Sequence, residues 1–194
     1  IDPPRMGRWN MNATVADYGK KHYKEGKADL FAVFMLLSVR RLAPNGKYGM
    51  INMQSWMFLS SFENLRKQLL EHEQIDSLLH LGPRTFDELS GEVVQNVAFV
   101  ISLHSPKYMG TYYRLVDGKN CADKENSFLT KQGEYPNVGQ KKFEQIPGSP
   151  IGYWVSEKIL LAFRECGLKR ICETRCGLST GRNDVFLRLW YEVN

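Results

Sequence analysis

The alternation of helical and strand-forming patterns over residues 29–105 constrains the fold of this chain more than any other feature. Residues 29–47 have the dense apolar spacing of a buried amphipathic helix, and the Pro-Asn-Gly at 44–46 ends it. Because strands alternate with helices of this length, we expect an α/β fold with a mostly parallel sheet and helical crossovers. The third strand follows a loop, which leaves an antiparallel direction open to it. The expected strands are 48–54, 75–82 and 92–105, with a second helix at 60–73.

The segments outside this alternation are more polar. Residues 10–28 predict a loop with one helical turn, and residues 105–126 predict a further strand followed by a loop. A polar stretch with spaced Gly and Pro covers 127–150. Residues 151–167 have a helical pattern that ends at a glycine. The serines at the start of the 60–73 helix, followed by Glu63, are typical of an N-cap.

Composition and charge exclude some classes of protein. The chain has 194 residues, 43% of them hydrophobic and 24% charged, which is enough apolar material for a real core. The net charge of +5 permits a polyanionic partner without demanding one. No signal-peptide pattern and no membrane-spanning apolar run is present, so we expect a cytoplasmic protein without a membrane partner. The chain opens in mid-pattern without Met, and we therefore expect a piece of a longer protein.

The cysteines and histidines give no metal signature. The four cysteines, at 121, 166, 172 and 176, lack C-x-x-C spacing, so free thiols in a reducing compartment are expected and a metal site is not. His72 ends a helix and His80 lies within a strand, and solvated or hydrogen-bonded structural roles are expected for both. The glycine-rich segment 177–184 is open to two interpretations: a turn-rich loop, or a loop that offers N–H groups and Arg182 to a phosphate or base edge.

The opening Asp2-Pro3-Pro4 is rigid, because each proline fixes its own φ and the second pushes the first towards an extended shape. If Ile1 ends a strand, this stretch holds the Asp2 carboxylate and the proline carbonyls at the carboxyl edge of the sheet. Ligands bind at that edge in open α/β sheets, and the 54–56 segment reaches it after the next strand. The alternative is a frayed, proline-rich terminus.

Four segments, taken in order, resemble adenine-specific DNA methyltransferases. They are Asp2-Pro3-Pro4, "KADLFAVFMLLSVRRLAPNGKYGMINMQSWMFLSSFENLRKQLLEH", "GEVVQNVAFVI" and "GLSTGRNDVFLRLWYEV". The particular likeness is to the large PglX-type enzymes of BREX phage-defence systems and to related restriction–modification methyltransferases. It extends over nearly the whole chain.

The resemblance implies a catalytic role for Asp2, Pro3, Pro4 and Arg5. The family carries Asn or Asp, Pro, Pro and an aromatic residue here, and this chain has Arg5 where the aromatic residue would stack on the flipped base. A guanidinium plane can also stack on a base. Core positions are favoured over base stacking for Trp56, Phe58, Phe86 and Trp190, and Phe86 is the candidate among them for a second stacking residue.

The resemblance also implies the domain plan and the partners. Residues 1–118 correspond to the C-terminal half of a Rossmann-like methyltransferase sheet, the substrate-side part of the catalytic domain. Residues 119–194 correspond to the start of a mixed target-recognition domain. The loop that binds the cofactor S-adenosylmethionine lies upstream in this family, so we expect the chain alone to be inactive. Double-stranded DNA is the expected partner, together with other subunits of a restriction–modification or phage-defence system. The candidate DNA-binding residues are Phe86, Lys169, Arg170, Arg175, Arg182 and Asn183.

Two other functions stay open. A non-catalytic DNA-binding module with a decayed proline motif is one, and Arg5 favours it. A small α/β protein unrelated to nucleic acid is the other, and it predicts no salt-dependent DNA binding.

Overall fold

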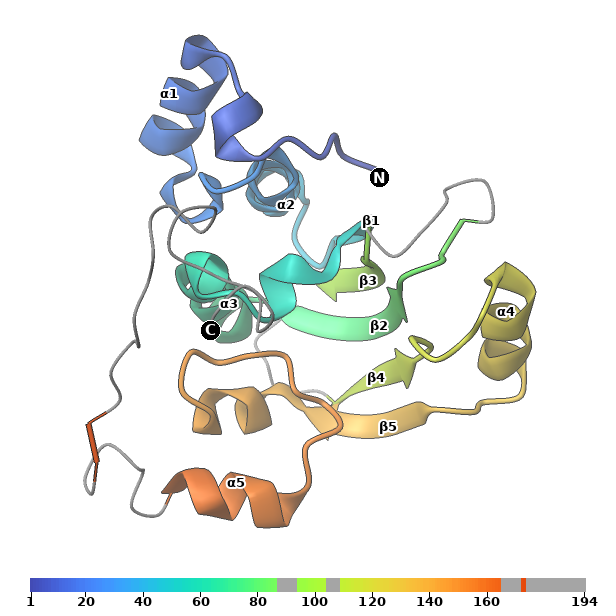
Figure 1. Ribbon diagram of the computed structural model, residues 1–194. Coiled ribbons are helices and arrows are strands. Elements are labelled where there is room, and N and C mark those ends of the chain that lie inside the picture. Colours follow the sequence, from blue (N-terminus) through green and yellow to red (C-terminus); the bar gives the residue numbers. More distant parts are fainter. Residues whose placement is uncertain (87–93, 104–108, 165–171, 174–194) are drawn as a thin grey trace, which may run out of the picture.

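Five strands form one mixed sheet in the order β1–β3–β2–β4–β5 (Figure 1). The computed structural model describes residues 1–86, 94–103, 109–164 and 172–173. Strand β3 runs antiparallel to both β1 and β2, β4 is parallel to β2, and β5 is antiparallel to β4. The sequence had left the direction of the third strand undecided, and in the structure it is antiparallel. The expectation of a mostly parallel sheet is wrong, because β3 returns between β1 and β2. The strands are β1 (Lys47–Met53), β2 (Gln74–Gly82), β3 (Asn96–Ser102), β4 (Met109–Arg114) and β5 (Glu134–Gly139).

Ile1 extends the sheet beside β1. Its amino group donates to the carbonyl of Gly49 at 2.9 Å, and its carbonyl accepts from the N–H of Ile51 at 3.0 Å. Two bonds to residues on either side of Met50 are the pattern of parallel pairing. Ile1 therefore pairs with β1 as the end of a parallel strand would, and the chain leaves this pairing in the direction of β1.

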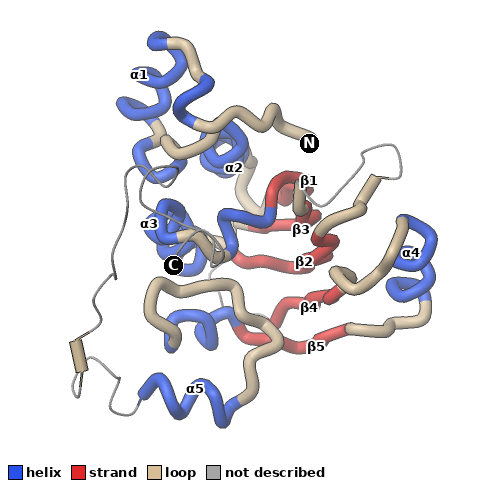
Figure 2. The backbone as a smooth tube through the Cα atoms, in the orientation of Figure 1, coloured by secondary structure: helices blue, strands red, loops and turns tan. Residues whose placement is uncertain are grey.

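Helix α2 forms where the apolar spacing predicts a helix. Asp29 caps it, with Oδ1 accepting from the N–H of Phe31 at 3.3 Å. Helix α3 also forms, but the predicted serine cap is wrong: its N-cap is Phe62, and the chain enters through a 3-10 turn at Ser60–Phe62. The two helices pack against the β1–β3–β2 part of the sheet (Figure 2). The α-helices are α1 (Ala13–His22), α2 (Leu30–Arg41), α3 (Glu63–His72), α4 (Cys121–Leu129) and α5 (Glu157–Arg164).

Three elements form where the sequence predicts irregular structure. Helix α1 replaces a loop; the Asn12 side chain caps it, and Gly19 is its buried residue. Helix α4 also replaces a loop, and its buried Lys124 donates to the carbonyls of Leu81 and Leu115 at the ends of β2 and β4. Strand β5 forms in the polar 127–150 stretch as an edge strand, where a proline is tolerated.

The helix at the end of the described chain is shorter than predicted. Helix α5 begins at Glu157, and residues 151–156 precede it without forming a helix. Ile151 and Tyr153 are instead buried in the same hydrophobic core as Trp56 and Phe99. The core therefore includes side chains on both sides of residue 118. The division into two domains at that point stays a prediction.

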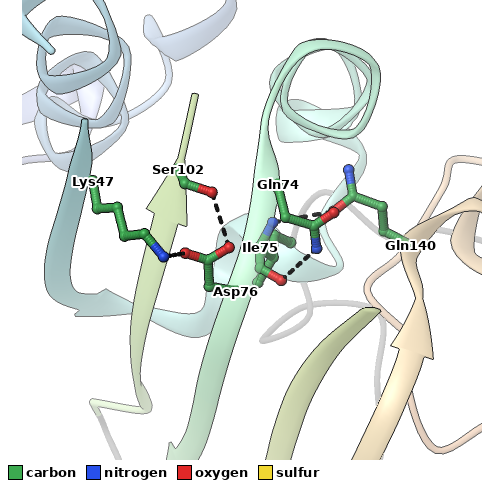
Figure 3. Close-up of polar contacts among 6 residues, drawn as sticks. All are labelled: Lys47, Gln74, Ile75, Asp76, Ser102 and Gln140. Atoms are coloured by element: carbon green, nitrogen blue, oxygen red, sulfur yellow. Dashed lines mark hydrogen bonds and ion pairs between the residues drawn. The ribbon is translucent and has the colours of Figure 1, made fainter. Parts of the chain in front are cut away.

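A β-bulge lies near the start of β2, at the amino edge of the sheet. The register of β2 against β3 shifts between Ile75 and Ser77, and Asp76 lies in the shift. Its two carboxylate oxygens bind Lys47 at 2.7 Å and Ser102 at 2.9 Å (Figure 3). The side chain of Gln140 reaches the same end of β2 and accepts from the N–H of Ile75 at 3.1 Å.

Candidate functional site

Several segments leave the sheet at its carboxyl edge. Ile1, β1, β2 and β4 run in one direction, so all of their ends lie on this side. The segments that follow these ends are Asp2–Pro4, Gln54–Trp56, Pro83–Phe86 and the turn after Arg114. Strand β3 runs the other way, so Gln95, just before it, lies at the same edge. The opening stretch and the 54–56 segment therefore lie at the same edge, as the sequence interpretation expected. Ligands bind at this edge in open α/β sheets.

The opening stretch presents free acceptors. Pro3 is buried, whereas Asp2 and Pro4 are exposed. Within the described part of the chain, neither the Asp2 carboxylate nor the Pro3 carbonyl has a hydrogen-bond partner. Asp2 also lines a groove of about 410 Å³ over the uncovered face of β1 and β3. The exposed Asp2 carboxylate thus remains available for donors from outside the chain, and the Pro3 carbonyl has no partner among the described residues.

The residues that follow hold this stretch in place. The N–H of Met6 donates to Oδ1 of Asp29 at 3.0 Å, and the carbonyl of Met6 accepts from the N–H of Leu30 at 3.0 Å. Gly7 forms an antiparallel bridge with Asp29. Since Ile1 is paired with β1 on the other side, the prolines lie between two anchored points. The alternative of a frayed terminus is wrong for this structure.

A chain of hydrogen bonds runs to the same edge from the interior. Nδ1 of buried His80 lies 3.0 Å from the hydroxyl of Tyr153, and its Nε2 lies 2.7 Å from Oε1 of Gln54. Nε2 of Gln54 donates in turn to Oε1 of Gln95. Burial, with help from the Arg114 and Lys124 cations, lowers the pKa of His80 to about 4. The imidazole is therefore neutral at physiological pH, and its hydrogen-bonded structural role confirms the sequence interpretation.

Aromatic rings surround His80. The Trp154 ring stacks on the imidazole with centroids 5.9 Å apart, and Phe58 contacts both rings. The Arg114 guanidinium lies 5.4 Å from the Trp154 ring centroid. Sequence reasoning missed Gln95, Trp154 and Arg114, because their meeting depends on how β3, β4 and the 150–154 turn are placed. The position of Gln54 directly after a strand was the one usable signal.

The other predicted residues fall into three groups. Phe86 is 40% exposed in the loop after β2, where a stacking residue would be accessible. Trp56 is fully buried, so the core role predicted for it is confirmed, and Phe58 is half-buried. The remaining ones lie outside the described residues: Lys169, Arg170, Arg175, Arg182, Asn183, Trp190 and the 177–184 loop.

Comparison with known families defines the class. Residues 2–86 match the family described as the Eco57I restriction-modification methylase. This stretch includes the proline motif, β1 and β2. A solved structure with a similar fold is a modification subunit assigned to a type I restriction enzyme from Vibrio vulnificus YJ016. Its TM-score is 0.50 at 12% identity, over 73% of this chain and 33% of that one. This likeness confirms the predicted α/β methyltransferase fold.

Two curated relatives are similar over almost the whole chain. The adenine-specific methyltransferase PglX of Lacticaseibacillus casei (strain Zhang) is 42% identical over 99% of it. The adenine-specific methyltransferase BrxX of Escherichia coli O9:H4 (strain HS) is 44% identical over 100% of it. The predicted relationship to PglX-type adenine-specific methyltransferases is therefore confirmed. The chain spans only 17% and 16% of the lengths of these two proteins.

The helices that the structure describes include none with the length and apolar character needed to cross a membrane.

Proposed function

We propose that the whole protein to which this chain corresponds is a DNA adenine N6-methyltransferase of a restriction–modification or phage-defence system. Asp2, Pro3 and Pro4 form its catalytic loop. The observation that carries this proposal is the pair of free acceptors, the Asp2 carboxylate and the Pro3 carbonyl, held between two anchored points at the carboxyl edge. The similarity to PglX and BrxX supports it.

The two acceptors answer a chemical difficulty. The amino nitrogen of adenine is a poor nucleophile, because its lone pair is delocalised into the ring. Hydrogen bonds from its two N–H groups to Asp2 and to the Pro3 carbonyl favour a pyramidal nitrogen with a localised lone pair. Fixed dipoles of this kind stabilise charge as it develops in the transition state. The base must first leave the duplex, where its amino group is paired.

Arg5 replaces the aromatic residue of the family motif. In this proposal its guanidinium stacks on the extruded base. Arg5 is half-buried beside the anchored Met6, so its side chain starts from a fixed backbone. Phe86 is the candidate for the opposite face of the base.

S-adenosylmethionine supplies the methyl group when it is bound. In the family that the chain resembles, the loop that binds this cofactor lies upstream of the proline motif. We therefore propose that most of the cofactor site lies outside these residues, and that the 194-residue chain alone does not methylate DNA.

Double-stranded DNA is the proposed macromolecular partner, and other subunits of the defence system are further partners. The net charge of +5 supports DNA binding. Residues 119–194 contribute the start of target recognition, with Lys169, Arg170, Arg175, Arg182 and Asn183 as contacts to bases or phosphates. A DNA substrate of this kind places the protein in the cytoplasm.

The test uses the full-length protein with S-adenosylmethionine and unmodified DNA, and it measures N6-methyladenine after digestion. Asp2→Ala should lower the rate about 10²- to 10³-fold, because one fixed acceptor is lost. Asp2→Asn is the matched control, since it keeps an acceptor oxygen at the same position, and it should retain much of the activity. Equal rates for wild type and Asp2→Ala would contradict the role of the loop.

The non-catalytic DNA-binding module remains the second candidate, and Arg5 is the residue that favours it. Suppose that the full-length protein binds DNA without methylating it. If Arg5 alone causes this loss and the rest of the catalytic site is intact, Arg5→Tyr should restore methylation. A variant that still produces no N6-methyladenine would support the DNA-binding module.

A further inference from the structure

A cavity lies at the carboxyl edge of the sheet, the edge at which the proposed catalytic loop follows the pairing of Ile1 with β1. It measures about 260 Å³. Its walls come from the end of β1, from the turn that follows it and from the residue before β3, so it opens on the side where Asp2–Pro4 leave the sheet. The lining residues are Met53, Gln54, Ser55, Phe58, Leu59 and Gln95.

The wall of this cavity combines flat apolar surface with a polar edge. Met53, Phe58 and Leu59 provide apolar contact, and Leu59 is exposed. The two amides and the Ser55 hydroxyl provide hydrogen-bonding groups. A nucleobase has the complementary form: an aromatic ring that stacks on apolar side chains, and an edge of donors and acceptors that amide side chains read.

The amides are fixed from the interior. Gln54 is held twice, because its backbone N–H donates to the carbonyl of Gln95 at 2.9 Å and its side chain joins His80 to Gln95. His80 is buried and is itself held by Tyr153 at 3.0 Å. A binding group that is locked in place before the ligand arrives loses little entropy when the ligand binds.

The chain of hydrogen bonds has a direction. Neutral His80 donates from Nε2 to Oε1 of Gln54 and accepts the hydroxyl proton of Tyr153 at Nδ1. Gln54 then donates to Oε1 of Gln95. Among the described residues the amide Nε2 of Gln95 has no acceptor, and Gln95 is exposed. The chain therefore ends in N–H donors at the wall of the cavity.

We infer that this cavity receives the ring of the target adenine, and that Gln95 donates a hydrogen bond to a ring nitrogen beside the amino group. His80 and Gln54 act as positioning residues for Gln95. The inference rests on the proposed function, which uses both amino hydrogens at Asp2 and the Pro3 carbonyl. The acceptors left on that edge of adenine are N1 and N7, which flank the carbon that carries the amino group. A donor-only group is the correct partner for either nitrogen.

The experiment pairs one residue with one atom of the base. The methylated sequence is first read from DNA modified by the full-length protein. Duplexes are then made with adenine, 1-deazaadenine or 7-deazaadenine at the target position, and kcat/KM is measured for wild type and Gln95→Glu. This substitution keeps the shape and the acceptor for Gln54 but replaces the donor with a carboxylate oxygen. Gln68→Glu, on half-buried α3 surface away from the cavity, is the matched control.

We expect Gln95→Glu to lower kcat/KM on adenine about tenfold or more, as for loss of one good base contact. One of the two deaza bases should cost wild type a similar factor but cost Gln95→Glu little. Additive losses with both deaza bases, or an unchanged rate for Gln95→Glu on adenine, would overturn the inference while the proposed function stands. A wild-type protein that makes no N6-methyladenine would remove both.

Discussion

The two edges of the sheet use polar side chains in opposite ways. At the amino edge, Asp76 and Gln140 bind other groups of the same chain (Figure 3). At the carboxyl edge, the hydrogen bonds that begin at Tyr153 end at Gln95, in donors that face a cavity. The hydrogen bonds at the amino edge link groups of this chain to one another and fix the strand register. The hydrogen bonds at the carboxyl edge end at the Gln95 amide, whose N–H groups a ligand in the cavity can accept from.

The largest effect on stability is expected at Arg66. It lies near the carboxyl edge, but its hydrogen bonds all go to groups of this chain, as those at the amino edge do. Its buried guanidinium donates to the carbonyls of Trp56, Leu59, Gly148 and Ser149 at 2.6–3.1 Å. Arg66→Met should cost about 3 kcal/mol or more of unfolding free energy, since several buried carbonyls lose their donor. Urea unfolding of the chain measures this cost.

Lys67 is the matched control for Arg66. It is the next residue on α3, and among the described residues its side chain forms an exposed ion pair with Glu63 and no other salt bridge. Lys67→Met should change the unfolding free energy by less than about 1 kcal/mol. Similar costs for the two substitutions would show that the buried carbonyls do not depend on Arg66.

Gln140 tests the amino edge. Its amide donates to the carbonyls of Leu70 and Glu73 and accepts from the N–H of Ile75. Gln140→Leu should cost about 2 kcal/mol, because three buried backbone groups lose a partner. The exposed Gln132→Leu should stay within about 0.5 kcal/mol of wild type in the same urea titration. A large loss at Gln132 and a small one at Gln140 would reverse the assignment.

The two edges should also respond to pH with opposite signs. Burial raises the pKa of Glu73 from 4.5 to about 7, so the folded state keeps a proton that the unfolded chain has lost. Stability therefore falls as pH rises from 4.5 to 7. His80, lowered from 6.5 to about 4, stays neutral where the unfolded chain is protonated. Its contribution is lost as pH falls from 6.5 to 4.

Substitution separates these two slopes. Glu73→Gln should flatten the loss on the alkaline side, and His80→Gln should flatten the loss on the acid side, in unfolding midpoints measured from pH 4 to pH 8, a window set by the cited pKa values. The exposed Gln132→Leu is the control: it changes no titratable group and should leave both slopes unchanged. A single slope removed by both buried substitutions would contradict the separation of the two edges.

The smallest stability effect should come from Gln95. Because it is exposed and ends its network, Gln95→Glu should change the unfolding free energy by less than about 0.5 kcal/mol. The same substitution is expected to lower kcat/KM on adenine. A stability loss as large as that of Gln140→Leu would mark Gln95 as structural and would weaken its proposed role in the cavity.

The sequence predicted the elements whose own side chains make the core. Strands β1 and β2 and helices α2 and α3 have clear apolar periodicity, and each formed within a few residues of its predicted range. Helices α1 and α4 were missed because each buries a single side chain or glycine, Gly19 and Lys124, which no periodic pattern reveals. Strand β5 was missed because Asn137 takes a φ of 56° and a proline precedes it.

In the candidate site, too, features local to one segment were predictable, whereas contacts between distant segments were not. The rigidity of the two prolines is a local property, and it correctly placed the Asp2 carboxylate beyond a strand end. The network through His80 joins residues 54, 80, 95 and 153, which only the tertiary fold brings together. No spacing within one element predicts such a set.

Arg66 has a consequence for how proteins of this kind can change over time. It grips the 148–149 turn solely through main-chain oxygens, which every amino acid possesses. The shape of that turn matters, with φ of 79° at Gly148 and 48° at Ser149, but the identity of the side chains at 148 and 149 does not enter these contacts. Substitutions within the turn can therefore spare the attachment as long as the positive φ values are kept. Beyond the turn, the buried Ile151 and Tyr153 tie the chain to the core through their own side chains, so the constraint passes from backbone shape to side-chain identity within a few residues.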